Sequence, residues 1–98
     1  MTERIEFEAT VWQWDARRSD SWFFVTLPVD RTEELADRTR GLRGFSSVKV
    51  RATIGTTTWS TSIFPGKDGY VLPVKKPVRL KERIDVEDVI GVVVVVLD

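Results

Sequence analysis

The chain has 98 residues, of which 42% are hydrophobic and 31% charged, and this length and composition are typical of one globular domain spanning residues 1–98. Fifteen basic and fifteen acidic side chains cancel, so the chain lacks the strong net positive charge of many nucleic-acid-binding proteins. It contains no Cys and no His, which excludes disulfides, thiolate nucleophiles, imidazole bases and the usual zinc and haem ligand sets.

Two strands are predicted near the N-terminus. Apolar and polar side chains alternate from residue 5 to residue 11, which is typical of a half-buried strand. The polar stretch 15–20 follows and predicts a hairpin loop. Residues 22–27 then form a short aromatic and aliphatic run that ends at Pro28, which predicts a well-buried strand.

A short helix is predicted over residues 31–40. Asp30 is followed by Glu33 three positions later, as in a capping box, and Gly41 is placed to end the helix in the left-handed conformation. This helix has little apolar surface, so we expect it to cover an edge or an end of the sheet.

Alternation returns after this helix. It predicts a strand at 48–54, a turn at Gly55, a strand at 57–64, a turn-rich loop, and a strand at 70–74. Pro77 suits the first turn of a short helix over residues 78–83. The final run, 89–97, shows no polar alternation, so we expect both of its faces to be covered.

The chain is therefore predicted to be mainly β, with about six strands and one or two short α-helices. Regular strand spacing and short turns favour a small antiparallel, partly open β-barrel with the helices capping its ends. Residues 1–8 lack a secretory signal pattern, and the longest apolar run, 89–97, is far shorter than the roughly 20 residues of a membrane helix. We expect a soluble cytoplasmic protein with no membrane partner.

The net charge of zero conceals an asymmetry along the chain. Residues 38–83 hold eleven basic and two acidic side chains, which gives +9, and the remaining residues sum to −9. The basic residues are densest between Lys75 and Arg83, where ammonium and guanidinium groups could hold a phosphate or a carboxylate. The alternative interpretation is a solvated face that pairs with the acidic residues at 85–88.

Three other patterns bear on function. Residues 44–48, between a helix and a strand, could form an anion-binding nest or a plain loop. The hydroxyl-rich stretch 56–62 has no histidine to activate it, so covalent catalysis is the least favoured interpretation. Among the four tryptophans, Trp22 and Trp59 fall in predicted strands and are expected in the core, whereas Trp12 and Trp14 are the best indication of a binding surface.

The order of several motifs resembles a known bacterial family, the domain of unknown function 1905 (DUF1905). The resemblance covers nearly the whole chain and rests on Trp22-x-Phe-Val-x-Leu-Pro28, Gly44-Phe-x-Ser-Val-x-Val50, Gly55–Trp59, Gly69-Tyr-x-Leu-Pro-Val-Lys75 and Val78-Arg79. It implies a double-split β-barrel with helical caps, alone or fused to a bacteriocin-protection (YdeI/OmpD-associated) domain, and it implies no established activity. Ser46 and Lys49 depart from the family pattern, and Glu87 stands where a Gly-Asp turn is usual.

The first functional hypothesis is a non-enzymatic binding module for a small anionic or aromatic ligand, needing no cofactor or metal. The residues expected to bind the ligand are Gly44, Phe45, Ser47, Tyr70, Lys75 and Arg79, provided that the fold brings residues 75–83 close to residues 43–49. The second hypothesis is a homodimer or an accessory domain that docks on a partner protein through residues 89–97 or an aromatic face. Nucleic-acid binding is less favoured. An enzyme is not excluded, because Lys, Arg, Tyr and carboxylates remain.

Overall fold

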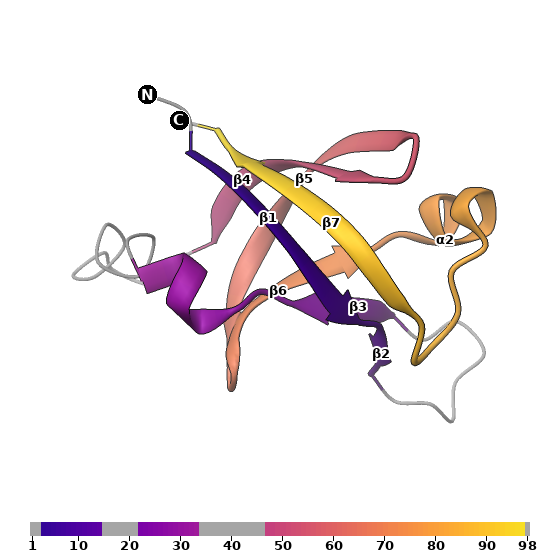
Figure 1. Ribbon diagram of the computed structural model, residues 1–98, viewed down its shortest axis with the longest axis horizontal. Helices are drawn as coiled ribbons and strands as arrows, with labels where there is room; N and C mark the ends of the chain where they lie inside the picture. The colour runs from indigo at the N-terminus through magenta and orange to yellow at the C-terminus, as the bar shows by residue number, and fades with distance from the viewer. Residues whose placement is uncertain (1–2, 15–21, 34–46, 98) are drawn as a thin grey trace.

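The computed structural model describes residues 3–14, 22–33 and 47–97 (Figure 1). Seven strands and one complete helix lie within these residues: β1 (Glu3–Thr10), β2 (Trp12–Gln13), β3 (Phe23–Thr26), β4 (Val48–Ile54), β5 (Thr57–Gly66), β6 (Gly69–Val74), α2 (Lys76–Glu82) and β7 (Val89–Val96). A helical turn also spans residues 29–33. The mainly β prediction is confirmed, with one strand more than expected because the short strand β2 follows Val11, where the first predicted strand ends.

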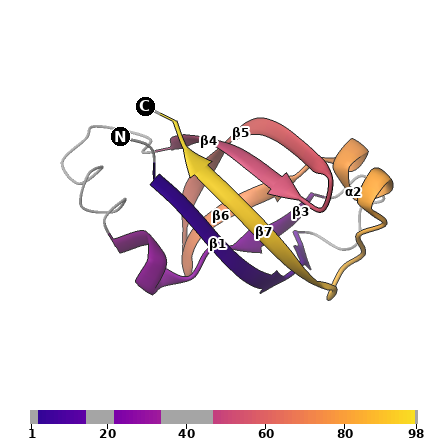
Figure 2. The same cartoon turned by 45° about the horizontal axis from the view of Figure 1, so that its top comes forward.

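The strands form one antiparallel sheet in the order β1-β7-β4-β5-β6-β3-β2. The sheet is curled into a half-barrel, so that β1 and β7 cross over β3 and β6 (Figure 2). The long strand β5 belongs to both halves, since it pairs with β4 over residues 57–63 and with β6 over residues 64–66.

Val11 joins the two outermost strands of this order. Its N–H donates to the carbonyl of Asp88 (2.8 Å), and its carbonyl accepts from the N–H of Glu87 (2.7 Å). Both partners belong to the turn before β7, which fixes the bend between β1 and β2. The bend carries the chain from one edge of the curled sheet to the other.

Alternating side chains fill the core as the sequence predicts. Ile5 and Val11 of the first alternating run are buried, and Val50, Ala52 and Ile54 are buried along β4. The expectation that both faces of β7 are covered is wrong. Val92, Val94 and Val96 are buried, but the intervening valines of β7 are only half-buried, because pairing with β1 and β4 protects the backbone of β7 and leaves its outer side chains partly in solvent.

The α2 helix caps one end of the half-barrel. Pro77 lies in its first turn as predicted, although the helix begins and ends slightly earlier than the expected 78–83. The Glu82 carboxylate accepts hydrogen bonds from the hydroxyls of Thr57 (2.6 Å) and Thr56 (3.1 Å). The end of the helix is thereby attached to the turn between β4 and β5.

The helical turn 29–33 lies on the opposite side of the molecule (Figure 1). It begins before Asp30, not after it, because the Pro28 carbonyl already accepts the N–H of Arg31 (3.1 Å). The predicted cap at Asp30 is therefore wrong. The rest of the predicted helix 31–40 and the predicted loop 15–20 lie outside the described residues.

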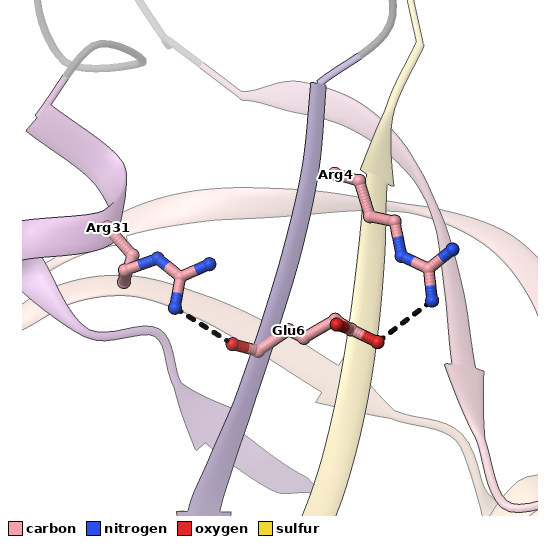
Figure 3. A network of polar contacts seen from close by, with 3 residues as sticks. All are labelled: Arg4, Glu6 and Arg31. Carbon is pink, nitrogen blue, oxygen red and sulfur yellow. Dashed lines mark hydrogen bonds and ion pairs between the residues drawn. The ribbon is translucent and has the colours of Figure 1, made fainter.

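This turn is connected to β1 through Arg31. Its Nη1 donates to the backbone carbonyl of Glu6 (3.2 Å), and the Glu6 carboxylate forms an ion pair with Arg4 (2.8 Å; Figure 3). The ion pair is exposed to solvent, so it contributes little to stability. The hydrogen bond from Arg31 to the Glu6 carbonyl has a different role. It occupies a backbone acceptor on the outer edge of β1, the edge that does not pair with β7.

Candidate functional site

Lys75 and Arg79 lie at the end of the half-barrel that α2 caps. Lys75 is exposed and immediately precedes the helix. Arg79 is half-buried, and its guanidinium carbon lies 3.8 Å from the centre of the Phe23 ring, a cation–π contact. Its buried Nε has no hydrogen-bond partner within the described part of the chain. Arg79 therefore packs against the core more than it faces solvent.

The other predicted site residues lie elsewhere. Tyr70 is 6% exposed in the core, and its carbonyl accepts the N–H of Leu27 (2.8 Å). Ser47 is exposed and immediately precedes β4, whereas α2 contacts the turn at the opposite end of that strand. At about 3.3 Å per residue, Ser47 is separated from Gly55 by about 26 Å. Gly44 and Phe45 lie outside the described residues. Of the four that are described, only Lys75 and Arg79 share a location.

The pair formed by Thr57 and Glu82 is a hydroxyl hydrogen-bonded to a carboxylate. The hydrogen bond from Thr57, with a smaller contribution from Thr56, holds the pKa of Glu82 below its usual range even though desolvation acts in the opposite direction. A lowered pKa makes the carboxylate a weaker base, which is the reverse of what activation of a hydroxyl nucleophile requires. The pair is suited to holding α2 in place.

Tryptophan placement differs from the prediction at one position. Trp22, expected in the core, is 56% exposed. Trp59 is half-buried and packs against the core as expected. Trp22 precedes β3 instead of lying inside it, and it has the same parity as Phe24, which points away from the buried Phe23 and Val25.

An aromatic stack therefore lies on the outer face of the sheet. The rings of Trp12 and Phe24 are 4.9 Å apart between centroids and 27° from parallel, and the rings of Trp22 and Phe24 are 6.4 Å apart and 19° from parallel. Trp12 and Phe24 are cross-strand partners in the pairing of β2 with β3. The stack is built on the last strands of the sheet order.

A hollow of about 440 Å³ opens beside this stack, and we call it the aromatic slot. Its lining residues come from β2, β3 and the β5–β6 hairpin: Trp12, Thr26, Gly66, Lys67, Asp68 and Val71. The indole Nε1 of Trp12 donates to the Thr26 hydroxyl (2.9 Å). Trp12 is thus stacked on one ring and hydrogen-bonded to the neighbouring strand, while 37% of its surface remains exposed.

The slot offers the chemistry of a binding site for a flat molecule. An indole presents a face on which an aromatic ring can stack. The Thr26 hydroxyl accepts from Trp12, so its own proton is free to donate to a ligand. The ammonium of Lys67 and the carboxylate of Asp68 add a donor group and an acceptor group to the lining.

A second hollow of about 380 Å³ lies on the outer face where β4 and β5 pair, and we call it the hydroxyl hollow. It is lined by Lys49, Ser60, Thr61, Ser62, Phe64 and Leu97. Lys49 is the cross-strand partner of Ser62, and Arg51 is the partner of Ser60. Neither basic side chain forms an ion pair with a described residue.

Of these residues, the sequence indicated only Trp12 as part of a binding surface. The sequence pattern places Lys67 and Asp68 in a turn-rich loop and marks Lys49 only as a departure from the family pattern. Their positions depend on which strands become neighbours. Among the described residues, no cluster of three or more carboxylates could hold a metal ion, and no helix is long and apolar enough to cross a membrane.

Comparisons with known proteins agree with the resemblance seen in the sequence. The family model described as "Domain of unknown function (DUF1905)" matches residues 7–94. A comparison with curated proteins finds no significant match.

Proposed function

The chain belongs to the DUF1905 family of domains of unknown function, and from the geometry of its surface we propose that it is a non-catalytic binding module. Its ligand is a small molecule with a planar aromatic ring, which lies in the aromatic slot against Trp12. The proposal keeps the aromatic alternative of the sequence analysis and moves the site from the basic residues near α2 to the outer face of β2, β3 and β6.

One observation carries this proposal: Trp12 is exposed and at the same time held in one orientation. An exposed tryptophan without contacts would have to lose side-chain freedom when a ligand stacks on it. The stack with Phe24 and the hydrogen bond to Thr26 have already restricted the side chain. Ligand binding then costs little additional side-chain entropy at Trp12, so most of the stacking energy of the exposed indole contributes to the affinity.

The predicted anion site at Lys75 and Arg79 receives less support. The guanidinium of Arg79 is engaged with the Phe23 ring, and its Nε is covered by protein atoms. A ligand could reach that atom only if α2 moved. Lys75 alone would be a single exposed ammonium, which binds anions weakly in water.

A role as a homodimer or accessory domain remains a second hypothesis. The structure limits how such a contact would form, because β1 and β4 pair with the two edges of β7 and leave neither for a partner strand. The outer edge of β1 is occupied at Glu6 by Arg31. A partner that docks through residues 89–97 would therefore have to contact the side chains of β7 and not its backbone.

The proposal is tested with planar aromatic compounds, such as indole derivatives, nucleosides and riboflavin, titrated into the ¹⁵N-labelled protein and followed by amide chemical shifts. Trp12→Ala should weaken binding about 5- to 150-fold, because stacking on an aromatic side chain contributes about 1–3 kcal/mol. Trp14→Ala is the matched control, since Trp14 is 59% exposed and does not line the slot.

Circular dichroism of each variant checks that the barrel is intact. Binding by Trp14→Ala should equal binding by the unmodified protein. Equal weakening by both variants, or no binding of any aromatic compound at millimolar concentration, would refute the proposal.

A further inference from the structure

The two hollows on the outer face are neighbours. Phe64 lines the hydroxyl hollow, Val71 lines the aromatic slot, and these two residues are cross-strand partners in the pairing of β5 with β6. Val71 is in turn the partner of Thr26 on β3. One row of side chains therefore leads from the Trp12 side of the slot to the edge of the hydroxyl hollow.

The distance between the hollows sets the size of a ligand that could occupy both. Thr26 on β3 and Lys49 on β4 are separated by three strand spacings in the order β4-β5-β6-β3. At about 4.8 Å for each spacing, this is about 14 Å across the strands, and Lys49 is offset by about 7 Å along them, because its partner Ser62 lies two residues before Phe64 on β5. A nucleoside carrying an extended chain of phosphates covers such a span, whereas a nucleoside alone does not.

The two hollows differ in the chemical groups that they present. The aromatic slot combines an indole face with the Asp68 carboxylate, which can accept hydrogen bonds from the amino groups of a base or the hydroxyls of a sugar. The hydroxyl hollow combines the Lys49 ammonium with the hydroxyls of Ser60 and Ser62, and these groups can all donate to phosphate oxygens.

Charge favours the same orientation. No acidic side chain is among the residues that line the hydroxyl hollow, and Arg51 adds a second positive charge beside Ser60. The acidic residue of the pair of hollows, Asp68, lies on the slot side. A phosphate is thus attracted to one end and an uncharged base to the other.

We infer that the ligand is a nucleoside di- or triphosphate, with its base stacked on Trp12 and its phosphates at Lys49 and Ser62. The sugar lies over Phe64 and Val71, the cross-strand partners through which the two hollows adjoin. This inference rests on the proposed function, because it requires an aromatic ring in the slot, and it adds the class of ligand and a second group of binding residues.

The experiment compares nucleosides with their diphosphates, namely adenosine with ADP, guanosine with GDP and uridine with UDP, without added metal and at two salt concentrations. At least one diphosphate should bind about tenfold or more tightly than its nucleoside, because hydrogen bonds to charged groups are among the stronger ones in proteins. Amide chemical shifts should change at both Thr26 and Ser62.

Variants then separate the two ends of the ligand. Lys49→Ala and Ser62→Ala should reduce the affinity for the diphosphate toward that for the nucleoside, and leave nucleoside affinity unchanged. Lys76→Ala is the matched control, since it removes the same charge from an exposed lysine of α2 that lines neither hollow. Circular dichroism confirms folding of each variant.

The outcomes distinguish this inference from the proposed function. If nucleosides bind and their diphosphates bind no more tightly, the phosphate site is overturned and the aromatic slot stands. The same holds if other aromatic compounds bind and nucleosides and their diphosphates do not. If Lys76→Ala weakens the diphosphate as much as Lys49→Ala does, the gain is general charge attraction and the inference fails. If no aromatic compound binds, both proposals fail.

Discussion

Replacing Gly55 with alanine should destabilise the protein, and the structure allows the effect to be worked out. Gly55 lies in the turn between β4 and β5 with a φ of 60°, in the left-handed region. A Cβ atom added there would contact the Glu82 carboxylate, with the carboxyl carbon 2.9 Å away. The substitution therefore strains the backbone and displaces the acceptor of the Thr56 and Thr57 hydroxyls.

The backbone component is the part with a known magnitude. A left-handed conformation costs a non-glycine residue about 1–2 kcal/mol. Alanine recovers about 0.4–1 kcal/mol, because it restricts the unfolded chain more than glycine does. The contact with Glu82 adds to the remaining cost, so we expect Gly55→Ala to lose about 1 kcal/mol or more. For a domain of this size, that lowers Tm by about 4–8 °C or more.

Thermal and urea unfolding measure this loss, with Gly91→Ala as the control. Gly91 lies within β7, and a Cβ added there meets no atom within 4 Å, so alanine should leave stability unchanged or raise it slightly. In a background that carries Glu82→Ala, the cost of Gly55→Ala should decrease, since the steric contact is gone. If Gly55→Ala unfolds at the same temperature as Gly91→Ala, the left-handed turn and its contact with α2 are refuted.

Two further predictions concern acidic residues near the turns. The pKa of Glu82 is lower in the folded than in the unfolded protein, so its stabilisation is complete above the unfolded pKa and is lost as pH falls through the folded pKa. Urea unfolding on acidification should show this loss, and Thr57→Val should reduce it; an identical pH profile in that variant would contradict the hydrogen-bond explanation. Glu87 has a φ of 72°, so Glu87→Gly should raise stability by about 0.5–1 kcal/mol, and Glu87→Gln, which keeps the strain, should not.

The sequence predicts the fold far better than it predicts the site. Because successive side chains of a strand point to opposite faces, the alternation of apolar and polar residues in the sequence identifies the inward-facing residues of β1 and β4. Pro77 likewise marks a helix start through its fixed φ. In the family pattern a Gly-Asp turn is usual where Glu87 stands, and the left-handed φ of Glu87 is a conformation that glycine adopts without strain.

The candidate site depends on pairings between distant segments. Nothing in the local sequence indicates that Trp12 lies beside Lys67, because this requires β2 to pair with β3, β3 with β6, and β6 with β5. The predicted site failed to assemble for the same reason. Ser47 and Lys75 were each expected in the site from their local sequence. They lie apart because Ser47 precedes the N-terminal end of β4, whereas α2 contacts the turn at the other end of that strand.

The position of β7 has a consequence for the order in which the protein can be made. It is the last of the described strands to leave the ribosome, yet it lies between β1 and β4 and pairs with both. Until residues 89–96 emerge, the N-terminal strand has no partner in its own half of the sheet, and its apolar side chains stay exposed. β1 and the edge of β4 that faces β7 therefore stay unpaired until residues 89–96 have been made, and a chain shortened before residue 89 would leave these edges open to aggregation.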